Sequence, residues 1–271
     1  MDRGEYVHGY SEREAERLND QARTLTSLLH HDIRYSVGSR VLEAGCGTGA
    51  QTIILARNSP GAEITSIDIS PESIRRAEER VRVEGITNVT FRAGDLFNLP
   101  FAPAYFDHIF ICFVLEHLPD PKRALTSLRP LIRPGGTITV IEGDHGSAYF
   151  HPDSAEAHTA IRCLIDLQRE AGGNALVGRE LYPLLAETGY TGVQVSPLMV
   201  YVDASRPELV DGFTRQTFTA MVEGVRDTVL GRGMMTKNEW ERAIADLART
   251  CEPDGVFCYT FFKATGTVAA D

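Results

Sequence analysis

The chain carries three glycines at alternate positions, directly after an apolar run that ends in an acid. Residues 41 to 50 read VLEAGCGTGA, so that Gly45, Gly47 and Gly49 follow Glu43. Glycine has no Cβ atom, so this backbone can turn sharply and a ligand can approach it closely. Doubly wound α/β folds hold nucleotides at a glycine-rich turn between their first strand and the following helix. The pattern therefore predicts a ligand-binding loop at the end of a parallel strand.

A second apolar run, EITSIDI at 63 to 69, ends on Asp68, about 20 residues beyond the glycines. An acid at that distance can accept hydrogen bonds from both hydroxyls of a ribose. Dinucleotide-binding loops usually read Gly-x-Gly-x-x-Gly and direct a helix N-terminus at a pyrophosphate, whereas this loop reads Gly-x-Gly-x-Gly. Glu43 would repel a pyrophosphate and favour a cation. This indicates S-adenosylmethionine, a sulfonium compound without phosphate.

Further segments follow in the order typical of one family: FRAGDL (91–96), FDHIFICFVLEHL (106–118) and RPGGTI (133–138). With the glycine loop and Asp68, they resemble the class I S-adenosylmethionine-dependent methyltransferases over roughly residues 38–143. The resemblance implies that Asp95 bonds the adenine amino group and that Cys112 and Phe113 line the cofactor. It says little about the acceptor. The predicted cofactor-binding residues of this core are Glu43, Ala44, Gly45, Gly47, Asp68, Ile69, Gly94, Asp95, Leu96, Cys112, Phe113 and His117.

Strands and helices are predicted to alternate, which implies a mostly parallel sheet covered on both faces. We expect an α/β fold with a doubly wound, seven-stranded, Rossmann-like methyltransferase sheet, forming one compact domain of 271 residues. Residues 1–35 should form an N-terminal helical cover, 36–145 the cofactor-binding core, and 146–271 the rest of the sheet with helical insertions. A fifth strand is predicted at 137–142 and a final antiparallel edge strand at 255–263.

Local signals mark several helix boundaries. Ser70-Pro71 and Asp120-Pro121 each combine a capping side chain with a proline at the first helical position. Pro130 should kink or shorten the second of these helices. A leading helix is predicted at 11–30, with Ser11 as its N-cap.

Residues 206–250 are predicted to form two helices, a larger insertion than the minimal fold needs. Phe213, Met221, Val225 and Val229 recur on one side at helical spacing. This stripe indicates packing onto the core, with a wall of the substrate site as the alternative. Helices joined to the rim of the sheet would form a lid over a small organic acceptor.

The candidates for catalysis follow the fourth and fifth predicted strands. His145 lies just past the fifth strand, where ligands bind in such sheets, and a neutral imidazole can take a phenol or amine proton. Its alternative role is to brace a loop. Glu142 can accept a substrate N–H or O–H, or bond a backbone amide. Glu116 and His117 can act in catalysis or simply start a helix.

Five other residues are predicted to contact ligands. Tyr6 and Tyr10 precede the leading helix, which in related enzymes folds over the bound cofactor; Tyr6 is assigned to substrate and Tyr10 to cofactor, with plain packing as the alternative. Gln21 can reach the carboxylate of the methyl donor. Tyr149 and His151 are assigned to the substrate pocket, with an ordered loop as the alternative.

No metal site is expected. Asp144, His145, His151 and Asp153 have a spacing that matches no zinc pattern. Cys112 lies where some RNA cytosine methyltransferases carry a nucleophile, but the Pro-Cys context is missing, and a small buried residue explains it better.

The amino-acid composition limits which binding partners and which cell compartment are expected. The formal net charge is −10, so the chain has no electrostatic reason to concentrate on nucleic acid or anionic membranes. Five cysteines without a pairing pattern favour a reducing compartment. The start of the chain, MDRGEY, lacks signal-peptide character, and no apolar run approaches the ~20 residues of a membrane span. We expect a cytoplasmic protein, a monomer or a homodimer.

These features together predict methyl transfer from S-adenosylmethionine to a small organic acceptor by in-line displacement. The chain is similar to ring-methylating tailoring enzymes of secondary metabolism, including ones that modify indoles. Quinone-pathway C-methylation is the alternative within the family. A nicotinamide-dependent oxidoreductase and a non-catalytic cofactor-binding protein are the alternatives from other classes.

Overall fold

A computed structural model of the protein describes residues 25–270. Its strands are β1 (Arg40–Ala44), β2 (Glu63–Asp68), β3 (Val89–Ala93), β4 (Phe106–Cys112), β5 (Ile132–His151), β6 (Thr191–Val202) and β7 (Val256–Thr267). Its α-helices are α2 (Ala50–Asn58), α3 (Pro71–Val83), α4 (Pro121–Leu128), α5 (Ala155–Glu170), α6 (Leu181–Glu187), α7 (Pro207–Leu209), α8 (Ala220–Glu223), α9 (Arg226–Gly231) and α10 (Lys237–Arg249). Shorter helical pieces are the 3₁₀ turns η1 (Leu115–His117), η2 (Arg129–Leu131) and η3 (Val177–Glu180), and the π-helical η4 (Val210–Thr219).

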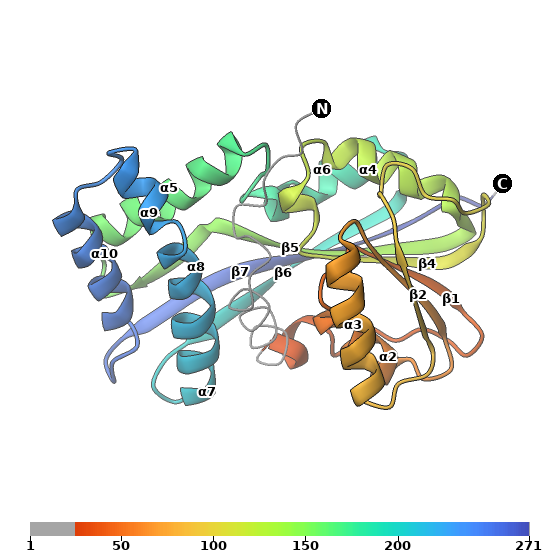
Figure 1. The fold of residues 1–271 in the computed structure, drawn as a ribbon, viewed down its shortest axis with the longest axis horizontal. Helices are drawn as coiled ribbons and strands as arrows, with labels where there is room; N and C mark the ends of the chain where they lie inside the picture. The colour runs from red at the N-terminus through yellow and green to blue at the C-terminus, as the bar shows by residue number, and fades with distance from the viewer. Residues whose placement is uncertain (1–24, 271) are drawn as a thin grey trace.

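The seven strands form one sheet in the order β3-β2-β1-β4-β5-β7-β6, with helices on both faces (Figure 1). The pairs among β1 to β5 are parallel, whereas β7 runs antiparallel to both β5 and β6. The predicted mostly parallel, doubly wound sheet is confirmed. The final strand predicted at 255–263 is antiparallel, as β7, but the prediction that it is an edge strand is wrong, because β7 lies between β5 and β6. This reversed strand distinguishes the sheet from the 3-2-1-4-5-6 order of dinucleotide-binding folds.

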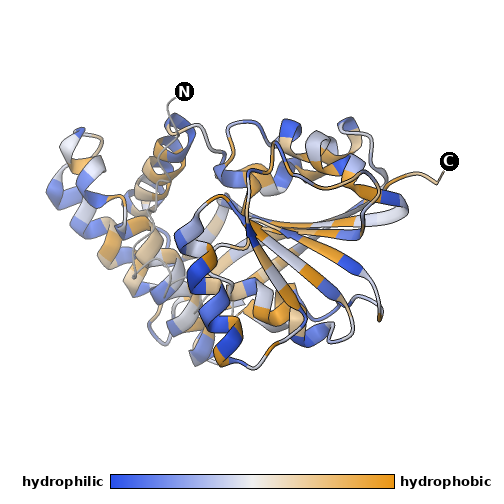
Figure 2. Ribbon diagram, turned by 45° about the vertical axis from the view of Figure 1, so that its right-hand side comes forward, coloured by the Kyte–Doolittle hydropathy of each residue, from blue (hydrophilic) through white to orange (hydrophobic). Residues whose placement is uncertain are grey.

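Two apolar clusters fill the layers on either side of the sheet. Val41 belongs to one cluster and its neighbour Leu42 to the other, because successive residues of a strand face opposite sides. A strand buried on both faces has to be apolar throughout. Figure 2 shows this as hydrophobic residues along the strands and on the helix faces turned toward them.

Helices α3 and α4 begin where a capping side chain followed by proline predicts a helix start. The Ser70 side chain accepts a hydrogen bond from the Ser73 amide at the start of α3, and Asp120 accepts one from the Arg123 amide at the start of α4. Helix α4 ends at Leu128, and Pro130 lies in the 3₁₀ turn that follows it. Of the predicted leading helix, residues 25–29 are helical, and residues before 25 lie outside the described part.

Strand β5 is much longer than predicted. It runs for 20 residues and continues to His151, nine residues past the predicted end at residue 142. The reason is β7, which pairs with β5 from Thr137 opposite Thr267 to His151 opposite Val256. The pairing is interrupted between Asp144 and Tyr149, so His145 lies in an irregularity within the strand rather than beyond its end. Such bulges redirect side chains beside active sites.

The insertion contains more helical segments than the two predicted. Helices α7, η4 and α8 follow one another without a break, and α9 and α10 complete it beside the far ends of β5 and β7 (Figure 1). The side chains of the predicted stripe are all buried, in the same apolar cluster as Trp240 of α10. The core-packing interpretation of that stripe is confirmed.

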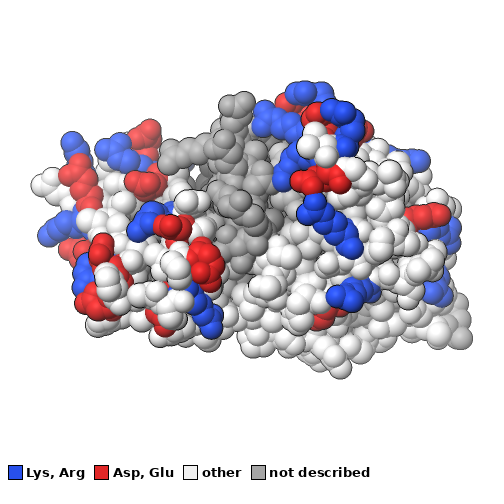
Figure 3. Space-filling model, turned by 90° about the horizontal axis from the view of Figure 1, so that it is seen from below, with Lys and Arg blue, Asp and Glu red and all other residues white. Residues whose placement is uncertain are grey.

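On the face drawn in Figure 3, basic and acidic side chains lie intermixed at both ends of the molecule. Among the helices that the structure describes, none has the length and apolar character needed to cross a bilayer.

The glycine loop gives a stability test with its own control. Gly49 and Gly47 both have positive φ, 81° and 51°, but a Cβ on Gly49 would lie 2.9 Å from the Ala77 Cβ of α3, whereas a Cβ on Gly47 would have no atom within 4 Å. Both Gly→Ala variants should suffer the ~1–2 kcal/mol strain of a left-handed alanine. Gly49→Ala should lose about 1 kcal/mol more, because α2 and α3 must also separate. Equal losses in urea unfolding would contradict this packing.

Candidate active site

The glycine loop is held by the end of the neighbouring strand. The amides of Gly45 and Cys46 both donate to the Ile67 carbonyl of β2, each at 2.8 Å. Gly45 has a φ of 82°, and a Cβ there would lie 2.5 Å from a methyl group of Val114. The loop therefore packs against the chain that leaves β4, and only glycine fits at this contact.

Asp68 is fixed at the carboxyl end of β2. Its Oδ2 accepts a hydrogen bond from the Gly47 amide and its Oδ1 one from the Ser70 amide, both at 2.9 Å. Partial burial raises the pKa of Asp68, although these two amides act in the opposite direction. The carboxylate thus lies directly beside the glycine loop, at the carboxyl end of β2.

Ile69 and Asp95 follow the carboxyl ends of β2 and β3 and provide an apolar side chain and a second acid beside Asp68. The side chain of Ile69 is 61% exposed. The amide of Gly94 donates to the Asp68 carbonyl, which joins the end of β3 to that of β2. Asp95 is exposed and accepts a bond from the Phe97 amide, while Leu96 is half-buried against the core. An exposed isoleucine and a carboxylate beside Asp68 suit an adenine ring and its amino group.

Phe113 follows β4 in a conformation that bulky residues rarely adopt. Its φ is 57°, its amide donates to the Ile141 carbonyl, and its ring lies 5.4 Å from that of Phe261. Left-handed backbone at a non-glycine residue is strained and is concentrated at functional sites. The sheet order reverses between β1 and β4, and ligands bind in the crevice at such a switch point. Gly45 and Phe113 flank that point, with buried Ala44 and Cys112 behind them.

Glu43 lies beneath the loop rather than at its surface. It is 2% exposed, and its Oε2 accepts bonds from the hydroxyls of Thr52 and Ser66, each at 2.6 Å. Burial raises the pKa of Glu43 to about 7 despite these two bonds. The side chain joins β1, β2 and α2 and is only partly ionised near neutral pH.

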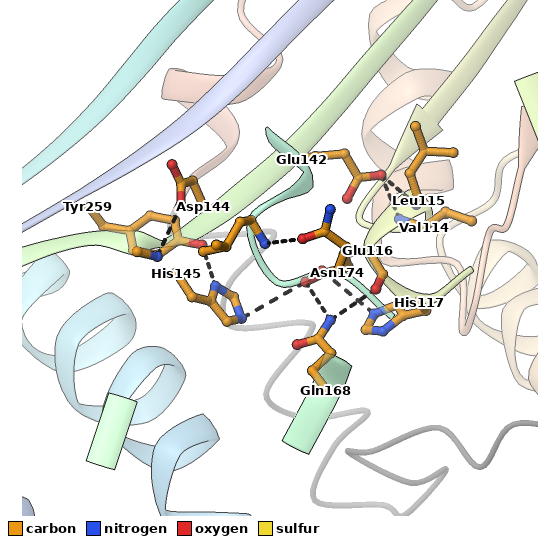
Figure 4. Close-up of polar contacts among 12 residues, drawn as sticks. Val114, Leu115, Glu116, His117, Glu142, Asp144, His145, Gln168, Asn174 and Tyr259 are labelled. Atoms are coloured by element: carbon orange, nitrogen blue, oxygen red, sulfur yellow. Dashed lines mark hydrogen bonds and ion pairs between the residues drawn. The ribbon is translucent and has the colours of Figure 1, made fainter. Parts of the chain in front are cut away.

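Glu142 holds the turn that follows β4 (Figure 4). Its Oε1 accepts bonds from the amides of Val114 and Leu115, at 2.9 and 2.7 Å. The residue has no exposed surface, and burial, followed by the neighbouring Glu116, raises the pKa of Glu142 well above its usual range. Of the two roles considered for this side chain, the described contacts are those of the backbone-bonding one.

His145 lies between a phenol and a carboxylate, as Figure 4 shows. Its Nδ1 is 2.7 Å from the Tyr259 hydroxyl and its Nε2 is 3.9 Å from Oε2 of Glu116. Gln168 donates to the same Oε2 at 3.3 Å, and His117 Nε2 lies 3.6 Å from the other oxygen of Glu116. The structure therefore brings together four of the residues predicted from the sequence, Glu116, His117, Glu142 and His145.

Sequence reasoning missed three members of this cluster. Tyr259 comes from β7 and Gln168 from α5, and both are almost fully buried. Arg179 makes two bonds of 2.7 Å to the carboxylate of Asp144 and so fixes the strand beside His145. Burial raises the pKa of Tyr259 well above its ordinary value. A buried polar residue in the apolar run FCYTFF was the only local signal for Tyr259.

The structure does not bring Tyr149 and His151 to this cluster. Tyr149 lies opposite Cys258 in the register of β5 and β7, and successive residues of a strand face opposite sides of the sheet. Tyr149 is therefore on the other face from Tyr259, where its hydroxyl contacts the Met199 sulfur and its side chain is 51% exposed. His151 is exposed further along the strand. Tyr6, Tyr10 and Gln21 lie outside the described residues.

Within residues 25–270, no group of three or more His, Cys, Asp or Glu side chains is arranged to hold a metal ion. The residues considered for one have other contacts: Asp144 binds Arg179, and Asp153 lies 2.8 Å from His158.

The comparison with known families assigns this fold and site to one of them. A family model described as a methyltransferase domain matches residues 36–189, more than half of the chain, and the chain belongs to this family. The class I methyltransferase identity inferred from the motifs is confirmed.

Curated relatives carry several different names. The uncharacterized 37.1 kDa protein in transposon TN4556 of Streptomyces fradiae is 31% identical over 208 residues, 76% of this chain and 59% of that protein. Methyltransferase str2 of Strobilurus tenacellus is 28% identical over 231 residues, 83% and 81% of the two chains. The 27-O-demethylrifamycin SV methyltransferase of Amycolatopsis mediterranei is 30% identical over 134 residues, 49% of each. In four of the curated relatives the match spans between 35% and 59% of their own length.

Solved structures share the fold at low identity. A geranyl diphosphate methyltransferase in complex with S-adenosylmethionine has a TM-score of 0.55 at 15% identity, covering 93% of this chain and 85% of that one. The cyclase SpnF has a TM-score of 0.53 at 20% identity, covering 95% and 82%. At these identities the likeness concerns the fold alone.

The buried carboxyl of Glu43 makes stability depend on pH. Because the folded pKa of about 7 exceeds that of an unfolded glutamate, Glu43 stabilises the fold fully below about pH 4.5, and this contribution is lost as the pH rises through 7. The free energy of unfolding of the wild type should therefore fall by on the order of 3 kcal/mol relative to Glu43→Gln between pH 4.5 and 8.

Urea titrations at several pH values measure this difference. Glu63→Gln, at the exposed first position of β2, serves as the control and should keep the wild-type dependence. If the curves of wild type and Glu43→Gln run parallel across this range, the buried carboxyl does not titrate as described.

Proposed function

We propose that the protein binds S-adenosylmethionine and transfers its methyl group to a small organic acceptor by in-line displacement. One observation carries the proposal: the Asp68 carboxylate lies 2.9 Å from the amide of Gly47, at the carboxyl end of β2 and beside the switch point of the sheet. Membership of the methyltransferase domain family supports it.

The residues present fit this cofactor. Asp68 would accept the ribose hydroxyls, Ile69 would cover a face of the adenine, and Asp95 would meet its amino group. The site of a Cβ on Gly47 is open, so a ligand can lie against the loop there. Bound in this way, the cofactor supplies a sulfonium methyl group that is already activated for displacement. The antiparallel β7 counts against a dinucleotide-binding fold. Glu43, predicted to favour a cation at the loop surface, is buried beneath the loop and does not bear on this choice.

The protein's own contribution to the reaction is mainly orientation. Holding the attacking atom about 3 Å from the methyl carbon can supply several kcal/mol of rate enhancement. The turn after β4 and the bulge in β5 place Glu116 and His145 at the same edge as the glycine loop. These side chains provide the polar groups that orient the acceptor and manage its proton.

For the acceptor we favour a secondary metabolite with an aromatic ring, an indole among them. The large helical insertion supports a small-molecule acceptor, and one relative is named for 27-O-demethylrifamycin SV. Quinone-pathway C-methylation is the alternative, supported by a relative named demethylmenaquinone methyltransferase. We expect neither nucleic acid nor a membrane as partner, because the net charge is −10. We place the protein in the cytoplasm, as a monomer or a homodimer.

Ligand binding and an acceptor screen test the function together. Calorimetry should give a micromolar or tighter dissociation constant for S-adenosylhomocysteine, and NADH fluorescence should be unchanged by the protein. Metabolite extracts incubated with radiolabelled S-adenosylmethionine should yield a labelled product for mass spectrometry. NADH binding without S-adenosylhomocysteine binding would favour the oxidoreductase. Tight binding without a labelled product would favour a non-catalytic protein.

The role of Asp68 has a matched control in Asp120, which also accepts a backbone amide but lies at the start of α4. Asp68→Ala should raise the dissociation constant of S-adenosylhomocysteine at least tenfold, since a charge-assisted bond is worth about 1.5–3 kcal/mol. Asp120→Ala removes a helix cap and should leave the affinity within about twofold. Equal affinities in the two variants would exclude Asp68 from ribose binding.

A further inference from the structure

A phenol, an imidazole and a carboxylate form a chain that joins β7, the bulge within β5 and the turn after β4. Tyr259 reaches it from β7, His145 from the bulge of β5 and Glu116 from the turn η1 after β4 (Figure 4). The described contacts of Tyr259 leave no room for a side chain at Gly143, whose Cβ would lie 2.3 Å from the phenol oxygen. The strand that carries His145 is thus shaped around that hydroxyl.

The neighbours of its two ring nitrogens indicate which nitrogen of His145 carries the proton. Nε2 faces Oε2 of Glu116 at 3.9 Å, and because a carboxylate oxygen accepts, this contact favours a hydrogen on Nε2. The phenol keeps its proton, because its surroundings are buried and acidic, so its O–H donates to Nδ1 of His145. A neutral imidazole that accepts at Nδ1 carries its hydrogen on Nε2. That N–H faces the carboxylate of Glu116.

This arrangement argues against His145 as the group that takes a proton from the acceptor. Its Nδ1 is engaged by Tyr259 and its Nε2 already bears hydrogen. Glu142 is also unsuited, since it has no exposed surface and its Oε1 holds two backbone amides. Glu116 differs from both because its side chain is 10% exposed, against 6% for that of His145.

Glu116 is held firmly while one of its oxygens stays available. Its backbone carbonyl accepts bonds from the side chain of Gln168 and the amide of Asn174, at 3.1 and 2.7 Å. Its Oε2 meets Gln168 and faces His145. Both imidazoles approach the carboxylate beyond ordinary hydrogen-bond length, His117 at 3.6 Å from Oε1 and His145 at 3.9 Å from Oε2, so their effect on it is electrostatic. Oε2 also accepts the bond from Gln168, whereas no described residue hydrogen-bonds to Oε1. Oε1 is therefore the atom best able to reach a bound molecule.

We propose that Glu116 takes the proton of the acceptor's attacking atom, and that Tyr259 and His145 are positioning residues that orient its carboxylate. The inference rests on the proposed methyl transfer. As the bond from the attacking atom to the methyl carbon forms, the bond from sulfur to that carbon breaks and leaves its electron pair on sulfur. The proton of the attacking atom passes to Oε1 of Glu116, which later releases it to water.

The proposal specifies the class of acceptor. A carboxylate is useful here only where the attacking atom bears a proton that becomes acidic as the methyl group arrives, as in a phenol, an alcohol or an amine. Within residues 25–270, the charged and titratable groups that face the Glu116–His145 pair are Cys112, His117, Glu142, Tyr259 and the Asp144–Arg179 pair. Arg179 already binds Asp144 in a two-bond contact, so Glu116 does not depend on it for orientation.

The tautomer of His145 can be measured without any acceptor. In ¹⁵N-labelled full-length protein bound to S-adenosylhomocysteine, the imidazole resonances, assigned by their loss in His145→Gln, should show hydrogen on Nε2 at pH 7. Tyr259→Phe should give a mixture of tautomers. The matched control is Tyr190→Phe, which removes another buried tyrosine hydroxyl, bonded to the Leu125 carbonyl, and should change nothing. Hydrogen on Nδ1, or an imidazolium, would overturn the positioning role.

Kinetics with an acceptor found in the extract screen test the proton transfer itself. Glu116→Gln should lower kcat about 100-fold or more, while the acceptor KM and the S-adenosylhomocysteine affinity stay within threefold. His145→Gln and Tyr259→Phe should move the acid limb of the kcat profile to higher pH, because the donor facing Glu116 is lost or misaligned. Tyr190→Phe should not move it. A structural role alone would lower kcat without moving that limb.

The outcomes of these experiments distinguish failure of the proposed methyl transfer from failure of the proton-transfer role of Glu116. A Glu116→Gln variant with wild-type kcat, beside an inactive His145→Gln, would overturn the inference and make His145 the base. If Glu116→Gln does not fold, the limb shifts in His145→Gln and Tyr259→Phe decide instead. If the wild type transfers methyl to no acceptor, the proposed function fails and the proton-transfer role falls with it. The tautomer result would still show whether the chain is ordered as described.

Discussion

The hydrogen bond between the Gly47 amide and the Asp68 carboxylate is the contact on which the cofactor half of this protein depends. It joins the loop after β1 to the end of β2, and it exists because the glycine loop adopts positive φ angles that few other residues tolerate. Beneath it, the buried carboxyl of Glu43 holds the hydroxyls of Thr52 and Ser66 and so fixes the same two strands from below. These contacts make the carboxyl ends of β1 and β2 rigid and hold the Asp68 carboxylate beside the backbone of the glycine loop.

Val114 couples the cofactor half to the polar cluster. The side chain of Val114 fills the space opposite Gly45, while its amide donates to Glu142. Movement of the turn that carries Glu116 would therefore be felt at the glycine loop. Strain at Phe113, next to Val114, is consistent with a turn that is held in place by its neighbours rather than by its own preference.

Features with local signals could be predicted from the sequence. The ends of β1 and β2 follow from apolar runs that stop at an acid, and the starts of α3 and α4 follow from a capping side chain before proline. These signals also located Asp68 and the glycines correctly in the fold.

Features that depend on distant pairing could not be predicted. The extent of β5 is set by β7, and Tyr259 meets His145 across 114 residues of chain. Without that register, Tyr149 could not be assigned to the opposite face of the sheet, and His145 was expected beyond a strand in which it actually lies. The burial of Glu43 likewise depends on α2 folding over it, which the motif does not reveal.

A crystal structure of the protein with S-adenosylhomocysteine tests the central claim most directly. We expect density over Gly45 to Gly49, with both ribose hydroxyls within hydrogen-bond distance of the Asp68 carboxylate. Density for that molecule at any other place, with the glycine loop bare, would contradict it.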